Sequence, residues 1–472
     1  MKTGEYVTPA DEAGTEVASE PSAGPRQVRD YTQGSINAAI WALAVPMTLE
    51  MAASSVYQIL DLVWVGRLGP AELAAVSVSS SVYWIINSMA NGLGIGGLAI
   101  VARRIGARRF RDANHATVQA VLLALIVGFG LTVLGLITRA PLLRSLGAGP
   151  DIFPMSMTYL EVMYGGLFTL VLLNVNNAIL RGAGNASAAL TAFVVARGLT
   201  VALEPFIVLG WAGFPRLGVT GAAAATVAGQ IAGVGYQLYM LTTGRARVRI
   251  ERQHLKPDLP LMRQIIEIGL PSTIQMMLRA ASRAAIMGLV GMFGTLALAG
   301  YGVANRIMLT ALIPGFGMGN AAGTLVGQNL GAQKPRRAER SAWIIAAYNL
   351  AFMGTIVLAV MFFAEPFIAF FNDTPQVVEY GALCLRILGI GYLFSAVGVV
   401  MGRALDGAGN TVPAMAINAI TLWGISIPVA YVLARVLAGA HGVWIGLAAG
   451  NVANGLLMAF WFRRGRWKHR EI

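Results

Sequence analysis

Twelve long apolar stretches follow one another along the 472-residue chain, separated by short charged or Gly/Pro-rich breaks. A transmembrane helix needs about 20 consecutive, mostly apolar residues. Hydrophobic residues make up 56% of the chain and charged residues 12%, against roughly 45–50% and 25% in soluble domains. The sequence therefore predicts an all-α membrane protein with twelve transmembrane helices, at residues 36–66, 72–101, 115–138, 152–179, 187–212, 218–242, 264–290, 296–328, 341–363, 377–402, 411–434 and 442–462.

The distribution of Lys and Arg predicts how these helices are oriented. Of the 35 basic residues, 25 fall in the terminal segments and the loops on their side, whereas the opposite loops hold five: Arg67, Arg139, Arg144, Arg216 and Arg435. Because Lys- and Arg-rich loops stay inside, we expect a multi-pass protein of the inner or plasma membrane with both termini cytoplasmic. This distribution accounts for the net charge of +13 through contact with the lipid bilayer, so no nucleic-acid partner is expected.

One constant offset of 225 residues relates the two halves of the chain. It maps Pro46 onto Pro271, Gly69 onto Gly294, and the run 182–185 onto 407–410. Each half holds six spans, an even number, so both halves enter the membrane in the same direction. This is the parallel repeat of some secondary transporters, in which two lobes rock about a central site.

The repeat divides the chain into five expected segments, and we expect a monomer. They are a disordered cytoplasmic tail at 1–33, an N-terminal lobe at 34–243, a cytoplasmic linker at 244–263, a C-terminal lobe at 264–463 and a basic cytoplasmic tail at 464–472.

Acidic side chains at membrane depth are costly and mark functional sites by default. In the first span, Glu50, Tyr57 and Asp61 lie about two and three helical turns apart, so they share one face. Glu204 in the fifth span lies a few residues before the outer end of its helix, as Asp61 does. Two carboxyl groups facing each other in an apolar bundle would hold a proton or a cation and release it when their surroundings change.

Two hydroxyl groups and one arginine lie near these acids in the sequence. Thr200, one turn before Glu204, and Thr226 in the sixth span could add ligands suited to a hard cation. The structural alternative is that Arg197, two turns from Glu204, neutralises it in an ion pair.

The second half has lost these acids and carries arginines instead. The repeat counterparts of Glu50, Tyr57 and Asp61 are Gln275, Ser282 and Ile286. The arginines could receive an anionic group of a substrate, pair with acids across the lobes, or reach toward the membrane surface. The candidates for lining a substrate cavity are Glu50, Glu161, Gln275, Arg279, Arg283 and Arg306.

The residue inventory argues against a cofactor enzyme. Cys384 is the single cysteine and the four histidines fall in loops or at span ends, so no metal site is predicted beyond Na⁺ at Asp61 and Glu204. No GxGD, GxSxG or HExxH pattern is present. We therefore expect no catalytic residues and no cofactor, and an intramembrane enzyme is only a remote alternative.

Four stretches together resemble the multidrug and toxic compound extrusion (MATE) family, prokaryotic branch, over about residues 36–460. They are 45–69, which contains Asp61, the LRGAGN run at 180–185, 204–226, which begins at Glu204, and 314–332. The resemblance implies a twelve-helix exporter with a cation network in its N-terminal lobe, at Asp61, Tyr57, Thr226 and Asn174.

Two departures from the family pattern bear on the coupling ion. The fifth-span acid, usually Asp, is Glu204, and the Asn usually one turn before it is Thr200. A longer acid and a lost amide weaken a sodium cage, which favours H⁺ over Na⁺.

The resulting prediction is a cation-coupled antiporter that exports amphipathic, often cationic small molecules by alternating access. The nearest alternative keeps the fold but makes the cargo a lipid-linked or anionic metabolite, because of the arginines in the second half.

Overall fold

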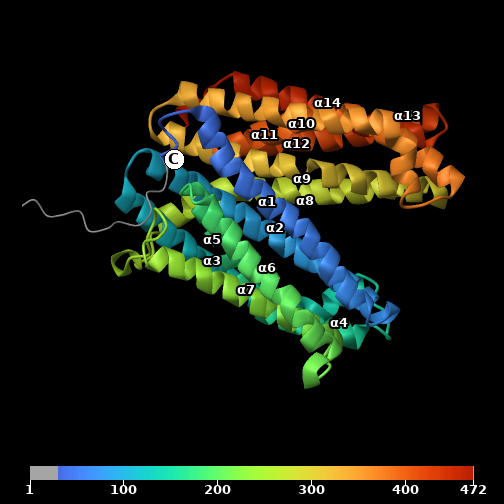
Figure 1. The fold of residues 1–472 in the computed structure, drawn as a ribbon, viewed down its shortest axis with the longest axis horizontal. Coiled ribbons are helices and arrows are strands. Elements are labelled where there is room, and N and C mark those ends of the chain that lie inside the picture. Colours follow the sequence, from blue (N-terminus) through green and yellow to red (C-terminus); the bar gives the residue numbers. More distant parts are fainter. Residues whose placement is uncertain (1–29, 471) are drawn as a thin grey trace, which may run out of the picture.

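The structure is a computed structural model that describes residues 30–470 and 472, and every regular element in them is a helix (Figure 1). The predicted all-α fold class is therefore confirmed. In chain order the elements are α1 (Ile36–Gly66), α2 (Pro70–Gly106), α3 (Phe110–Ser145), α4 (Phe153–Gly165), α5 (Leu167–Gly182), α6 (Ala186–Leu209), η1 (Trp211–Gly213), α7 (Gly218–Thr242), η2 (Arg252–His254), α8 (Leu259–Gly291), α9 (Thr295–Gly331), α10 (Pro335–Ala369), α11 (Pro375–Gly407), α12 (Thr411–Ala419), η3 (Ile420–Ser426), α13 (Ile427–Val436), α14 (Ala440–Arg463) and η4 (Arg466–His469).

In the part of the chain that the structure describes, nine helices are long and apolar enough to cross a membrane, with α12 to α13 counted as one. The pair α4 and α5, bent by 49°, makes a tenth. The helices α7 and α8 occupy the sixth and seventh predicted spans with 25 and 33 residues, but they fall outside that count. The twelve predicted spans thus match twelve helical segments, of which length and composition alone identify ten.

The internal repeat recurs in the conformation of the backbone. Gly69 and Gly294, which precede α2 and α9, have φ angles of 144° and 95°, a region that favours glycine. Asn185 and Asn410 precede α6 and α12 with φ angles of −101° and −105°. Corresponding helices of the two halves are therefore joined by the same kinds of turn.

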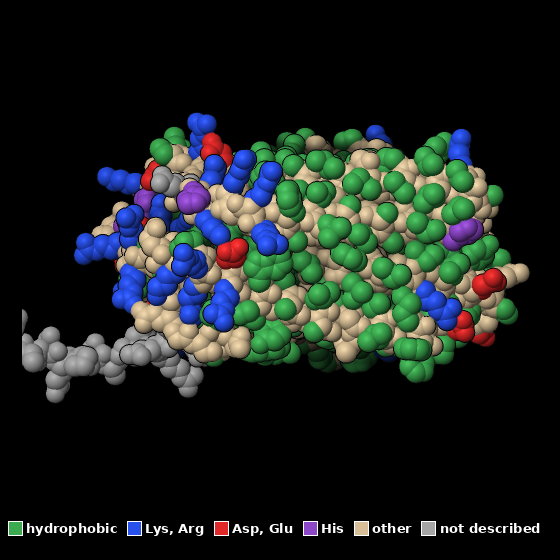
Figure 2. All heavy atoms as spheres, turned by 90° about the horizontal axis from the view of Figure 1, so that it is seen from above, with side chains coloured by type: hydrophobic (Ala, Val, Ile, Leu, Met, Phe, Trp, Pro, Cys, Tyr) green, Lys and Arg blue, Asp and Glu red, His purple; other side chains and the backbone are tan. Residues whose placement is uncertain are grey.

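The two halves lie side by side at the end that carries the C-terminus and diverge toward the opposite end (Figure 1). One group holds α2 to α7 and the other holds α8 to α14, while α1 runs between them. Figure 2 shows a band of hydrophobic side chains between the two ends, with Lys and Arg gathered at the end that carries the C-terminus. An apolar band of this kind suits contact with lipid.

The opening helix of each half crosses to the other half. The first turns of α1 pack in a core with α9, α10 and α11, whereas Val65 near its end packs on α6 and α7. The start of α8 packs with α2, α3 and α5, whereas its end packs within the second half. Helix packing thus joins the two predicted lobes through α1 and α8.

The backbones of the two halves touch where these helices cross. A Cβ atom on Gly106 would lie 1.9 Å from the carbonyl oxygen of Gln328, and a Cβ atom on Gly331 would lie 1.9 Å from that of Arg103. Arg103 and Gln328 are themselves related by the offset of 225. Only glycine permits so close an approach, so these two contacts close one end of the molecule symmetrically.

The boundaries predicted for the terminal segments need correction. Residues 1–29 of the predicted tail lie outside the described residues, but Tyr31 and Thr32 are buried. The Tyr31 hydroxyl donates to the carbonyl of Gly184 at 3.2 Å, so the prediction of disorder is wrong for residues 30–33. The basic segment at 464–472 also packs, because Trp467 is fully buried and stacks on Phe462.

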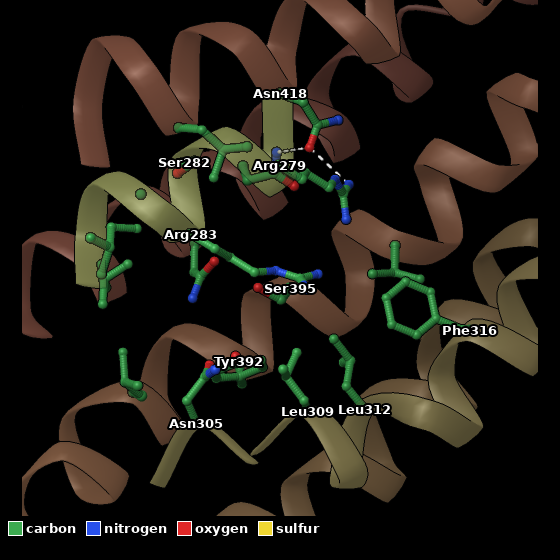
Figure 3. Close-up of a pocket in the computed structure, with 18 of the residues that line it drawn as sticks. Arg279, Ser282, Arg283, Asn305, Leu309, Leu312, Phe316, Tyr392, Ser395 and Asn418 are labelled. Carbon is green, nitrogen blue, oxygen red and sulfur yellow. Dashed lines mark hydrogen bonds between the residues drawn. The ribbon is translucent and has the colours of Figure 1, made fainter. Parts of the chain in front are cut away.

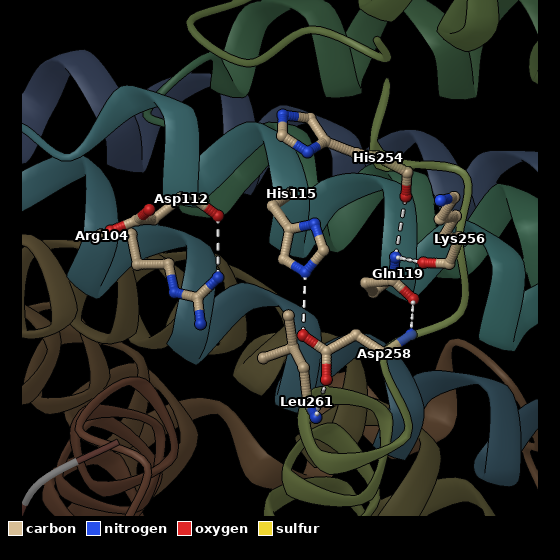
Figure 4. A network of polar contacts seen from close by, with 8 residues as sticks. All are labelled: Arg104, Asp112, His115, Gln119, His254, Lys256, Asp258 and Leu261. Atoms are coloured by element: carbon tan, nitrogen blue, oxygen red, sulfur yellow. Dashed lines mark hydrogen bonds and ion pairs between the residues drawn. The ribbon is translucent and has the colours of Figure 1, made fainter. Parts of the chain in front are cut away.

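The linker between the halves is held against α3 (Figure 4). The side-chain amide of Gln119 donates to the carbonyls of His254 and Lys256, each at 2.8 Å, and accepts from the Asp258 amide at 2.9 Å. His115 donates to Asp258 at 2.9 Å, which together with the amide of Leu261 lowers the pKa of Asp258. Asp258 caps α8, so this network fixes where the second half begins.

The glycine contacts make a testable prediction about stability. Replacing Gly331 with Ala forces a Cβ atom against the Arg103 carbonyl, and overpacking of this kind costs roughly 1–3 kcal/mol. We expect Gly331→Ala to lower the thermal unfolding midpoint of the detergent-purified protein. The matched control is Gly354→Ala in α10, where a Cβ atom would meet nothing within 4 Å; equal midpoints for the two variants would contradict the close contact.

Candidate transport sites in the two halves

The structure brings the predicted acids of the first half together. Glu204 on α6 is fully buried, and no donor group among the described residues reaches its carboxylate oxygens. Asp61 on α1 lies within electrostatic range of that carboxyl group. Tyr57 and Thr226, from α1 and α7, complete the group, since Tyr57 lies within range of both acids and of the Thr226 hydroxyl. Asp61 and Glu204 therefore lie close together, as their similar distance from the outer ends of their helices led us to expect.

Arg197 does not neutralise Glu204 as the structural alternative supposed. Its guanidinium carbon lies over the Tyr57 ring, 4.5 Å from the centroid, and no ion pair joins it to Glu204. The arginine adds positive potential near the acids without satisfying either of them. The site can therefore still take up a proton or a cation.

Two predicted ligands point elsewhere. The Thr200 hydroxyl donates to the carbonyl of Ala196 at 2.9 Å, within its own helix. The Asn174 amide donates to Asn87 on α2 at 3.3 Å and to the carbonyl of Leu170 at 3.0 Å. Neither bond involves Asp61 or Glu204, and both use donor groups, so the oxygens of Thr200 and Asn174 remain acceptors and their part in a cation site stays a prediction.

Sequence reasoning missed a chain of polar contacts beside the acids. Gln230 on α7 donates to the Tyr83 hydroxyl at 2.7 Å and accepts from Thr169 at 2.9 Å. Tyr159 on α4 lies within electrostatic range of Asp61 and Tyr57. The available signal was the presence of polar residues at membrane depth on several helices, but their mutual facing depends on how those helices pack.

Four of the residues predicted to line a substrate cavity lie outside the cavity described next, and two of them form ion pairs. Glu50 is buried and pairs with Arg181 at 3.7 Å, and it accepts a hydrogen bond from Asn177 at 3.2 Å. The side chain of Glu161 is 60% exposed and pairs with Arg139 at 3.7 Å. Arg306 is exposed, Gln275 is half-buried, and none of the four lines the cavity described next. Sequence position gives membrane depth, but it does not say which way a side chain points.

Arg279 and Arg283 do line a cavity, which lies within the second half and has a volume of about 150 Å³ (Figure 3). The walls come from α8, α9, α11, α12, η3 and α14. Arg279 donates to the side-chain oxygen of Asn418 at 2.8 Å. Asn454 also donates to Asn418, at 3.3 Å, so an amide network holds one wall.

No three His, Cys, Asp or Glu side chains gather into a metal site within the described residues. The two polar sites therefore consist of an acid pair in one half and an arginine pair in the other. Two repeated halves that diverge at one end, each with a polar site between apolar helices, define the class as a membrane transporter.

Comparison with known proteins gives the family. The chain belongs to the MatE family, whose model matches residues 46–206 and, a second time, residues 271–432. The starts of these two matches are again 225 residues apart, which supports the internal repeat.

Three similar proteins illustrate the family. A probable multidrug resistance protein NorM from Thermotoga maritima is 26% identical over 91% of this chain and 93% of its own length. An FAD transporter from Shewanella oneidensis is 26% identical over 88% and 91%. A solved outward-facing structure of a multidrug resistance MATE family transporter aligns with a TM-score of 0.87 and 26% identity over 95% of this chain and 100% of that one.

The different surroundings of Glu50 and Glu161 make a testable prediction. Glu50→Gln leaves Arg181 as an unpaired buried charge, a change that typically costs about 3–5 kcal/mol. Glu161→Gln breaks an exposed pair, typically worth about 0–1 kcal/mol. We expect thermal unfolding of the purified protein to show a large destabilisation for the first variant and a small one for the second. A reversed order would show that Glu50 is not held by Arg181.

Proposed function

We propose that this member of the MatE family is a proton-coupled antiporter of the cell membrane that exports amphipathic, often cationic compounds. The proposal includes cytoplasmic termini, action as a monomer, no bound cofactor and no enzymatic activity. The names of relatives as multidrug resistance proteins support the substrate class.

One observation carries the proposal: Glu204 is fully buried, no donor group of the described residues reaches its carboxylate oxygens, and its neighbour at hydrogen-bonding range is the carboxyl group of Asp61. Two carboxylates in an apolar bundle repel each other and lose hydration, so ionising both at once is costly. A bound proton removes one of the charges. An ionised pair would in turn attract a cationic substrate, so a proton and a cation can occupy the site alternately.

The packing of α1 suggests how occupancy could alter access. The helix carries Asp61 and Tyr57 on its later turns, whereas its first turns pack in the core of the second half. A change in charge at Asp61 would alter how α1 lies against α6 and α7. Because the same helix bridges the halves, that change would weaken or strengthen the closed end.

The ligand set favours H⁺ over Na⁺. A sodium ion needs several oxygen ligands in a fixed cage, but the acid on α6 is the longer Glu204 and the residue one turn before it is Thr200 in place of an amide. A proton needs only one carboxylate oxygen.

The experiment is dye efflux from proteoliposomes under an imposed pH gradient or, separately, an imposed Na⁺ gradient. We expect the pH gradient alone to drive efflux by the wild-type protein, and Asp61→Asn with Glu204→Gln to lower the rate to that of empty liposomes. The matched control is Glu161→Gln, an exposed acid that should leave the rate unchanged. Efflux that persists in the double variant would contradict the proposal.

An anionic metabolite is the second candidate cargo, because one relative is an FAD transporter and two arginines, Arg279 and Arg283, line the cavity in the second half. The same liposomes loaded with FAD test it. Efflux of FAD without efflux of the dye would replace the first proposal with the second.

A further inference from the structure

We propose that the cavity in the second half is a binding site for an oxyanion, the carboxylate or phosphate group of a small molecule, held by Arg279 and Arg283. This site goes beyond the proposed antiport of cationic compounds, since it is separate from the acids of the first half. For the anionic cargo, it rests on the second candidate function and names the residues that would hold the anion.

The cavity carries positive charge that no acid balances. The 19 residues that line it include two arginines and no Asp or Glu. Neither guanidinium forms an ion pair with any acid among the described residues. The acid that lies within range of Arg279, Asp406, is engaged by Arg403 at 3.4 Å and by Ser272 at 3.4 Å. A bound anion would supply the missing partner.

The side chains around the arginines offer hydrogen-bond donors rather than acceptors alone. The guanidinium of Arg283 reaches into the cavity from α8, and Ser395 on α11 also lines it (Figure 3). Ser282 is 1% exposed, and its hydroxyl has no partner among the described residues. Planar guanidinium groups bind carboxylate and phosphate with two parallel hydrogen bonds, and the free hydroxyl would add a third.

The size and lining of the cavity indicate what carries the anionic group. A volume of about 150 Å³ is comparable to a cavity that holds one benzene molecule. Leu309, Leu312 and Phe316 form an apolar wall opposite the arginines (Figure 3). The site therefore fits a small aromatic or aliphatic acid, or the anionic end of a larger amphipathic molecule.

The internal repeat places this cavity at the position that the acid site occupies in the first half. The offset of 225 maps Tyr57 onto Ser282, Asp61 onto Ile286 and Thr226 onto Asn451. All three counterparts line the cavity. The two halves thus hold equivalent sites of opposite charge.

The backbone beside the cavity is also unusual. The π-helix η3 at Ile420–Ser426 begins two residues after Asn418, and its Leu422 contributes to the cavity wall. Helices of this kind occur mostly as short bulges and frequently at functional sites.

The test uses the full-length protein in detergent and benzoate as the probe, with neutral benzamide as its matched control. We expect isothermal titration to detect benzoate binding and no benzamide binding. Losing a charge-assisted hydrogen bond weakens binding by about tenfold or more. We therefore expect Arg283→Gln to bind benzoate about tenfold or more weakly than the wild type does. Arg306→Gln removes an exposed arginine from the same half and should leave binding unchanged.

Further arms separate the possible outcomes. Benzoate binding is also measured for Arg279→Gln, which should weaken it in the same way. If this variant does not fold, the comparison of benzoate with benzamide in the wild-type protein still tests the proposal. The double variant Asp61→Asn with Glu204→Gln should still bind benzoate. Failure of the antiport proposal can therefore be told apart from failure of the anion-site proposal. Competition by phosphatidylglycerol nanodiscs, but not by phosphatidylcholine ones, would assign the oxyanion to a lipid headgroup. Equal binding of benzoate and benzamide, no binding of either, or full binding by Arg283→Gln would overturn the proposal.

Discussion

The cost of holding an ionisable side chain away from water is the constraint on which the rest of this structure depends. A charged group at the membrane centre costs roughly 2.5–3.5 kcal/mol. It therefore persists there only when another group neutralises it or when it has a function. Glu50 has its partner in Arg181. Glu204 has only another acid beside it. It lies where a proton or a cation can complete the site.

The crossing of α1 and α8 connects these sites to the closed end of the molecule. Each helix begins in the core of the opposite half and ends beside the polar site of its own half. Glycine contacts between the halves form at the same end, at Gly106 and Gly331. A change of charge at either site therefore acts on a helix that is already part of the contact between the halves.

Much of this arrangement follows from the sequence, because the repeat and membrane depth are both encoded by position along the chain. The offset that relates Gly69 to Gly294 predicted two equivalent halves, and equal depth predicted that Asp61 meets Glu204. The direction in which a side chain points is not encoded in this way, so the ion pair between Glu161 and Arg139 was not predicted. The network at Asn418 was also missed, because it forms only where α8, α12 and α14 pack together.

Proton release on substrate binding tests most directly whether the acid pair is the coupling site. The measurement adds a cationic dye to purified wild-type protein in weakly buffered detergent solution and follows the pH. The account predicts that the dye displaces a proton from wild-type protein and none from Asp61→Asn with Glu204→Gln. Equal proton release by the two proteins, or none from the wild type although it binds the dye, would contradict it.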